Sequence, residues 1–249
     1  MMAIRVIYYG GAREKNKDGS SRRIGINDNS AFKFAALNIK ESYQKFNDTV
    51  ILKKITTARE IVTFLNSQSN SSIASLDILS HGSPLSLNFS LNSYEACGFY
   101  SSWIGKKAIE SYYSDDEGDF TFTHQAQSVS DIPWSRFKDS ARVQLHGCLT
   151  ASDWFRSPNG KKLFPTVVDN IVQQMSDELD SAGKKNAIVI GHTTRGNPLI
   201  NGSATTLLQQ DYRHGERKIY NNGDLVLTTK ERGYLSNELL QQKIKGWTP

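Results

Sequence analysis

The chain has 249 residues, of which 38% are hydrophobic and 22% charged, and its formal net charge is +5. This composition excludes an intrinsically disordered chain, which would hold fewer apolar and aromatic residues, and no apolar run reaches the roughly 18 residues that a membrane span requires. Two cysteines exclude a disulfide framework and a zinc site made of cysteines alone. The sequence does not decide whether Cys97 and Cys148 form a single disulfide.

Apolar runs alternate with helical patterns in the first half of the chain. They predict strands at 4–9, 49–52 and 75–80 and helices at 31–46 and 58–65. Residues 28–30 are expected to cap the first helix, which carries Phe34 and Leu37, with Ala35 and Ala36, as its apolar residues. Thr57 is expected to cap the second helix. The third strand ends at His81, which Gly82 follows.

The second half begins with a less regular region, 83–140, which we interpret as a long insertion with a helix at 103–113 and an acidic loop at 115–119. The patterns after it predict strands at 141–145 and 186–190, a helix at 164–181, a hairpin of 218–220 against 225–227 with its turn at 221–224, and a helix at 237–245.

Strands that alternate with helices predict an α/β fold with a mostly parallel central sheet and helices on both faces. No internal repeat and no linker divide the sequence. We therefore expect one domain over 1–249, with the insertion around 83–140 and a C-terminal extension of hairpin and helix over 197–249.

Three of the predicted strands end in chemically reactive side chains. His81 follows the third strand, His146 and Cys148 follow the fourth, and His192 follows the fifth. In an open parallel sheet, ligands bind beyond the carboxyl ends of the strands. These side chains are therefore the candidates for a functional site.

His81 and Cys148 together suit nucleophilic catalysis. A free thiol is only a few per cent thiolate at neutral pH, and a neighbouring imidazole can take its proton or stabilise the anion. Attack on a carbonyl also requires donors for the oxyanion. The backbone N–H groups of Gly82 and Cys148 are the natural ones.

The segments around these two residues, LDILSHG at 76–82 and VQLHGCLTA at 143–151, resemble the caspase-like (clan CD) cysteine peptidases, in particular the bacterial and CHAT-type branch. The resemblance covers roughly 4–192 and implies a caspase-like three-layer sandwich. It implies that His81 is the general acid/base, that Cys148 is the nucleophile, and that the N–H groups of Gly82 and Cys148 bind the oxyanion. It further implies a thiol protease that cleaves protein substrates without a cofactor, as a secreted effector or toxin or as a self-processing protease. His146 departs from the pattern, since many members have a small or apolar residue there.

The other histidines and the second cysteine receive different interpretations. We expect His146 and His192 to contact substrate, with a hydrogen-bonding core residue and a loop residue as the respective alternatives. His124 and His214 are expected at the surface, and Cys97 is expected to be a structural or exposed thiol. Asp28 suits a helix cap better than a third catalytic member.

We expect neither a metal nor a cofactor. The imidazoles at 81, 146 and 192 and the thiol at 148 are nitrogen and sulfur donors, but no close-spaced ligand pair such as HExxH is present. Two other functions stay open. One is a different thiol hydrolase, acyltransferase or deamidase that uses the same dyad, and the other is a non-catalytic interaction module.

The expected partner is a protein or peptide substrate. The 30 basic residues exceed the 25 acidic ones only slightly and are scattered without interleaved aromatics, so we expect no nucleic-acid partner. We expect no membrane partner either. The N-terminal apolar run is too short for a signal peptide, which favours a cytoplasmic protein or one secreted by a route independent of a signal peptide.

Overall fold

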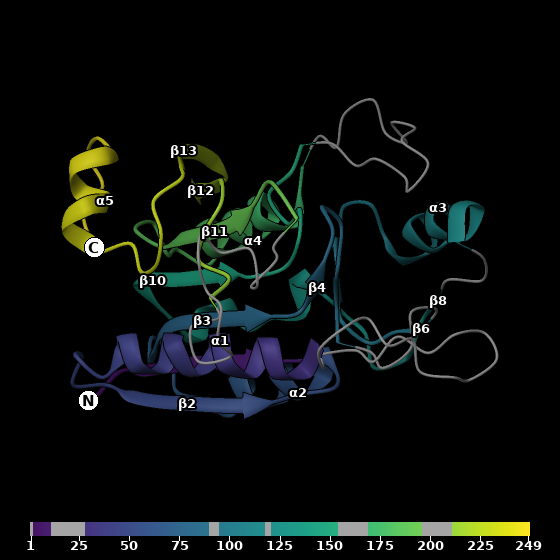
Figure 1. Ribbon diagram of the computed structural model, residues 1–249, viewed down its shortest axis with the longest axis horizontal. Helices are drawn as coiled ribbons and strands as arrows, with labels where there is room; N and C mark the ends of the chain where they lie inside the picture. The colour runs from purple at the N-terminus through teal and green to yellow at the C-terminus, as the bar shows by residue number, and fades with distance from the viewer. Residues whose placement is uncertain (1, 11–27, 90–94, 118–120, 154–168, 196–210) are drawn as a thin grey trace.

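The computed structural model describes residues 2–10, 28–89, 95–117, 121–153, 169–195 and 211–249 (Figure 1). Expectations that fall between these ranges lie outside the described residues. Within them, no helix has both the length and the apolar character that crossing a bilayer requires.

A seven-stranded sheet forms the centre of the molecule, in the order β13-β12-β11-β10-β3-β1-β2. Its strands are β1 (Ile4–Tyr9), β2 (Thr49–Lys54), β3 (Ile73–Leu79), β10 (Phe137–Leu145), β11 (Ile188–His192), β12 (Arg217–Asn221) and β13 (Asp224–Thr229). The first five run parallel to one another, whereas β12 and β13 form an antiparallel edge. The predicted mostly parallel sheet is confirmed.

Helices cover both faces of this sheet (Figure 1). α2 (Ala58–Asn66) and α4 (Ile171–Ser181) share one buried cluster with residues of β1, β3 and β10, whereas α1 (Asp28–Tyr43) and α5 (Asn237–Lys243) pack in clusters on the opposite face. The strands β3 and β11 consist mostly of buried apolar residues, because parallel strands between two helical layers are covered on both sides. The fold is a three-layer α/β sandwich.

Turn and cap chemistry sets several element boundaries as expected. The N–H of Thr57, the N-cap of α2, donates to the Glu60 carboxylate at 3.3 Å. In the β12–β13 hairpin, Asn222 and Gly223 have φ of 52° and 79°, the left-handed geometry that a tight two-residue turn needs. A Cβ on Gly223 would also lie 2.1 Å from Asp177 Oδ1. Only glycine therefore fits at position 223 of this turn.

α1 differs from its prediction at its start and along its buried stripe. The helix begins at Asp28, so residues 28–30 form its first turn and do not precede it as caps. The buried residues are Phe32, Ala35, Ala36, Ile39 and Tyr43, whereas Leu37 is 39% exposed. Of the four apolar residues expected on the buried side, Ala35 and Ala36 are buried, Phe34 is half-buried and only Leu37 is exposed.

Three other helices differ from their predicted ranges. α3 (Lys106–Glu117) starts later than 103 and includes residues 115–117, so the predicted acidic loop is wrong there. α4 begins at Ile171, where the Asn170 side chain accepts a hydrogen bond from the Gln173 N–H at 3.0 Å. The predicted start at 164 lies outside the described residues. α5 ends at Lys243 and not at 245.

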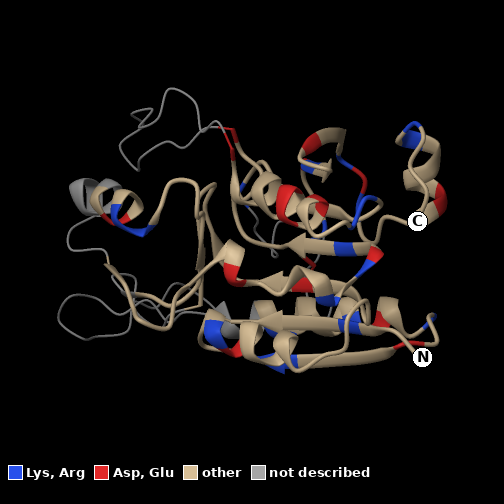
Figure 2. Ribbon diagram, turned by 180° about the vertical axis from the view of Figure 1, so that it is seen from behind, with Lys and Arg blue, Asp and Glu red and all other residues tan. Residues whose placement is uncertain are grey.

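Small elements connect β3 to β10. They are β4 (His81–Gly82), β5 (Leu87–Asn88), β6 (Glu95–Ala96), β7 (Phe99–Tyr100), α3, β8 (Thr121–Phe122), β9 (Gln127–Ser128), η1 (Val129–Asp131) and η2 (Trp134–Arg136). β4, β6, α3 and β8 lie beyond the carboxyl ends of the parallel strands (Figure 1), whereas η2 lies at the amino end of β3, where its Ser135 and Arg136 carbonyls accept from the N–H groups of Ser71 and Ser72. The strands pair as β4-β5, β6-β8 and β7-β9. Basic and acidic residues are interspersed over the described elements (Figure 2).

Candidate active site

The sheet register places His81 and Cys148 at the same edge of the sheet. β3 and β10 are parallel neighbours, with Leu145 opposite Ile78, and the N–H of His146 donates to the Ile78 carbonyl at 2.8 Å. Each candidate residue follows its paired position by three, His81 after Ile78 and Cys148 after Leu145. Because neighbouring strands are about 4.8 Å apart, the two side chains leave adjacent turns.

These two turns pack backbone against backbone. A Cβ added to Gly82 would lie 2.7 Å from Thr150 Cγ2, 3.0 Å from the Gly147 Cα and 3.1 Å from the Cys148 carbonyl oxygen. A Cβ added to Gly147 would in turn lie 3.0 Å from the Gly82 Cα. The glycines therefore allow the turn that carries His81 to touch the turn that carries Cys148.

The turn after Cys148 is held by the end of β11. The N–H of Ala151 donates to the His192 carbonyl at 2.9 Å, and the N–H of His192 donates to Thr150 Oγ1 at 3.2 Å. Leu149 has a φ of 59°, a left-handed conformation that is uncommon for a non-glycine residue and that is concentrated at functional sites. Its N–H donates to the Thr194 carbonyl at 3.1 Å. The position of Cys148 is thus set by three strands, β3, β10 and β11.

The Gly82 N–H points away from its own hairpin partner. β4 and β5 are antiparallel, and the hairpin is closed by a hydrogen bond from the Ser83 N–H to the Ser86 carbonyl at 2.8 Å. Hydrogen-bonded and non-hydrogen-bonded pairs alternate along an antiparallel ladder, so the next pair, Gly82 with Leu87, is of the second kind. The Gly82 nitrogen lies 3.2 Å from the position of a Cβ on Gly147. This N–H therefore does not bond to Leu87 and lies beside the Cys148 turn.

Both candidate side chains are half-buried, and neither Cys97 nor Cys148 forms a disulfide. The bridge between Cys97 and Cys148 that the sequence left open is thus absent. Cys97 lies in the insertion, where its sulfur accepts a hydrogen bond from Thr123 Oγ1 at 3.4 Å.

Replacing Gly82 with alanine tests the contact between the turns. The added methyl meets backbone atoms that cannot move independently, so we expect a loss of about 1–3 kcal/mol of unfolding free energy and a fall of about 10²-fold in Cys148 reactivity, because small displacements in a reacting pair are costly. Thermal unfolding and alkylation rates measure the two effects. Gly105→Ala is the control: a Cβ there meets nothing within 4 Å, but its φ of 79° disfavours alanine, so this variant should lose stability and keep the wild-type alkylation rate. Equal alkylation rates for the two variants would contradict the proposed contact.

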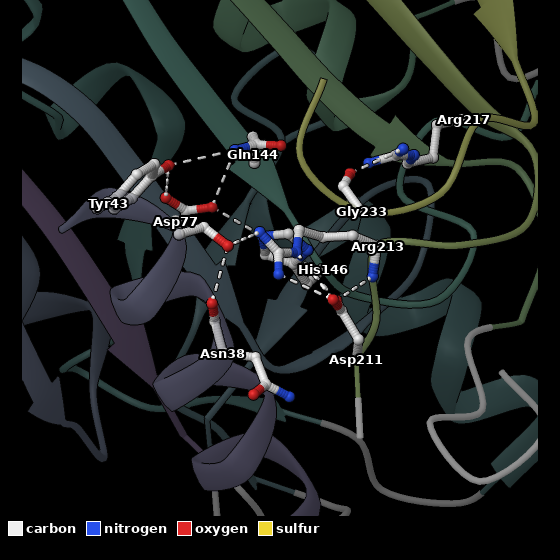
Figure 3. A network of polar contacts seen from close by, with 10 residues as sticks. Asn38, Tyr43, Asp77, Gln144, His146, Asp211, Arg213, Arg217 and Gly233 are labelled. Carbon is white, nitrogen blue, oxygen red and sulfur yellow. Dashed lines mark hydrogen bonds and ion pairs between the residues drawn. The ribbon is translucent and has the colours of Figure 1, made fainter. Parts of the chain in front are cut away.

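His146 is hydrogen-bonded to a buried carboxylate beside the Gly147–Cys148 turn. It is 3% exposed, and its Nε2 lies 2.9 Å from Asp77 Oδ1 (Figure 3). Asp77 is fully buried and also accepts from the Tyr43 hydroxyl at 2.6 Å and from Gln144 Nε2 at 3.1 Å. A carboxylate accepts hydrogen bonds, so a proton on Nε2 makes this contact a hydrogen bond donated by His146. Nδ1 is buried and has no hydrogen-bond partner among the described residues.

His192 lies beside His146, with their ring centroids 6.2 Å apart. It is 2% exposed, and burial, together with the nearby His146 and Arg217, holds its pKa well below the usual value. His192 is therefore uncharged at neutral pH. Both imidazoles are buried in this structure. Nothing in the structure tests the prediction that they contact substrate.

The segment 211–217 packs against α1: Tyr212 shares a buried cluster with α1 residues, and Arg213 donates to Ser42. Arg217 is 1% exposed, and its Nη2 donates to the carbonyls of Glu231 and Gly233, the second at 3.2 Å (Figure 3). Burial, with the neighbouring Arg213, lowers the pKa of Arg217 to about 10. His214 belongs to the same segment and is half-buried, so its expected surface position is wrong. His124 is exposed, as expected.

Sequence reasoning missed Asp77, Arg213 and Arg217. One signal was available for the first: an aspartate inside the apolar run at 76–79 must find partners if the run is a buried strand. The side chain of Asp28 lies outside what the structure describes. Among the described residues, no group of three or more His, Cys, Asp or Glu side chains is arranged to hold a metal ion.

Comparisons with known proteins found no matching family model and no similar curated protein.

Proposed function

We propose that the chain is a cysteine peptidase in which His81 and Cys148 act together on a peptide bond of a protein substrate. The observation that carries this proposal is the close packing of the His81–Gly82 turn against the Gly147–Cys148 turn at the carboxyl edge of a parallel sheet. An imidazole and a thiol from adjacent, rigid turns form the minimal unit for nucleophilic catalysis.

The reaction follows from these groups. Cys148 transfers its thiol proton to His81, and the thiolate attacks the carbonyl carbon of the scissile bond. The tetrahedral intermediate collapses, and the leaving amine takes the proton from His81. Water then transfers a proton to His81 and attacks the acyl-thioester, which releases the new carboxyl terminus and restores the thiol.

The N–H groups of Gly82 and Cys148 are proposed to bind the oxyanion. The Gly82 N–H points away from β5 and lies beside the Cys148 turn, whereas the neighbouring Leu149 N–H is engaged by Thr194. Backbone donors held by packed turns need no reorganisation when the negative charge develops.

His146 and His192 are proposed to contribute to substrate recognition, because they lie directly behind the nucleophile turn. The strand-end motifs resemble those of caspase-like peptidases, and this supports a protease that acts in the cytoplasm or as an effector exported without a signal peptide.

Labelling with a peptide that carries a thiol-reactive electrophile tests the assignment. We expect the wild-type protein and Cys97→Ala to be labelled at the same rate and Cys148→Ala to lose labelling. Cys97 is the matched control because it is also half-buried and forms no disulfide. Undiminished labelling of Cys148→Ala would refute the nucleophile.

Mass spectrometry of candidate protein substrates separates the peptidase from its rivals. A peptidase generates new N-termini that are absent with Cys148→Ala. An acyl or deamidated product without chain cleavage would indicate a different thiol enzyme. A phenotype that survives Cys148→Ala would indicate a non-catalytic module.

A further inference from the structure

The imidazole of His81 packs against an aromatic side chain from α1. The rings of Phe32 and His81 are edge-to-face, with centroids 5.6 Å apart and an interplanar angle of 82°. Phe32 is 2% exposed, so its ring is held on all sides by the protein. One side of the imidazole of His81, the residue proposed as general acid/base, therefore packs against a buried ring of α1.

A residue from the C-terminal part of the chain also packs against Phe32. The ring of Tyr212 stacks on that of Phe32, with centroids 5.1 Å apart and an angle of 27° between the planes. Tyr212 is 5% exposed and lies 131 positions after His81 (212 − 81). His81, Phe32 and Tyr212 thus form a continuous row of rings, which we call the aromatic row.

The residues that flank Tyr212 hold it in place. Arg213 pairs with Asp211 at 2.8 Å, and its Nη1 donates to Ser42 Oγ on α1 at 3.1 Å (Figure 3). The Arg213 carbonyl accepts from the Gly233 N–H at 2.7 Å. Arg213 is 5% exposed, so this ion pair is screened little by solvent. Tyr212 is therefore fixed both to α1 and to the segment that follows β13.

We propose that Phe32 and Tyr212 are positioning residues that hold the His81 imidazole in the orientation needed to exchange a proton with Cys148. This inference rests on the proposed function. The row restricts rotation of the imidazole, because a turned ring would clash with Phe32, and Phe32 cannot move aside while Tyr212 stacks behind it. Proton transfer depends steeply on donor–acceptor geometry.

A shortened side chain at either position leaves a cavity beside His81. The imidazole then populates orientations that no longer face the thiol. Because an imidazole near the thiol favours the thiolate, its departure raises the thiol pKa. The reactivity of Cys148 at neutral pH falls, and substrate binding changes less.

The experiment measures the rate of Cys148 alkylation by iodoacetamide as a function of pH in Phe32→Leu and Tyr212→Leu. We expect about tenfold slower alkylation at neutral pH and a profile shifted to higher pH in both variants. Phe137→Leu is the matched control, because Phe137 is fully buried and packs on Trp134 with ring centroids 5.3 Å apart, in a cluster that does not include Phe32. It should lose comparable thermal stability and keep the wild-type profile.

Tyr212→Phe keeps the stacked ring and should restore most of the reactivity. Wild-type profiles in both leucine variants, or equal losses in Phe137→Leu, would overturn the positioning role. If Phe32→Leu does not fold, Tyr212→Leu tests the same row from its far end. If His81→Ala alkylates like the wild type, the proposed function itself fails. If that variant is slow but the row variants are normal, only the positioning role fails.

Discussion

His81→Ala should lower kcat/KM for peptide cleavage by about 10²–10⁴-fold, the range that a positioned general acid/base contributes. Without the imidazole, the thiol of Cys148 loses the base that favours its thiolate, and the leaving amine receives no proton from the enzyme. The chain should still fold, because His81 is half-buried and lies in the two-residue strand β4, outside the central sheet.

The pH dependence gives the second part of this prediction. With His81 present, the rate should be bell-shaped, because activity needs both the thiolate and the protonated imidazole. In His81→Ala the residual rate should rise with pH toward the thiol pKa without a descending limb below it. His124→Ala, at an exposed position in the insertion, is the control and should match the wild type. A bell-shaped profile of normal height in His81→Ala would exclude His81 as the acid/base.

Asp77→Ala should cost about 3–5 kcal/mol of unfolding free energy, the range for removing one partner of a buried polar network. The substitution leaves three buried donors without their acceptor: the Tyr43 hydroxyl, Gln144 Nε2 and His146 Nε2. No solvent reaches Asp77, whose exposure is 0%. Denaturant unfolding with linear extrapolation measures the loss.

Two further variants show how much of this loss of unfolding free energy comes from the buried network. Tyr43→Phe removes a single donor and leaves Asp77 with two, so we expect a loss of only about 1 kcal/mol. Asp180→Ala removes an ion pair with Lys185 in which the aspartate side chain is 32% exposed, and it should change stability by less than about 1 kcal/mol. If Asp77→Ala is as mild as Asp180→Ala, the network does not stabilise the fold.

The two predictions concern neighbouring residues, His81 and Asp77, whose loss should affect different properties of the protein. His81 lies at the edge where substrate would bind, and Asp77 lies four positions earlier in the same chain segment, inside the sheet. Asp77 holds His146, and the two residues that follow His146 form the nucleophile turn. We therefore expect loss of Asp77 to act first on stability and loss of His81 to act on chemistry.

Local chemistry made much of the fold predictable. The apolar runs located all seven strands of the central sheet, Thr57 located the start of α2, and Asn222-Gly223 located the hairpin turn. Helix starts at Asp28 and Ile171 were missed, because many residues near a helix end can serve as caps and tertiary packing selects among them. The candidate pair of His81 and Cys148 came from residue type and strand ends, which are also local features.

Non-local contacts decided the rest. The sequence by itself determined the alternation of strands and helices and the reactive side chains at the strand ends, because hydrophobic periodicity and turn preference act over a few neighbouring residues. Only the tertiary structure decided that Asp77 would bind His146, that Tyr212 would stack on Phe32, and that the two glycine turns would touch. Each of these contacts joins residues far apart in the chain. A buried polar or aromatic group takes its partner from whatever the folded chain brings beside it, and this choice leaves no periodic pattern in the sequence.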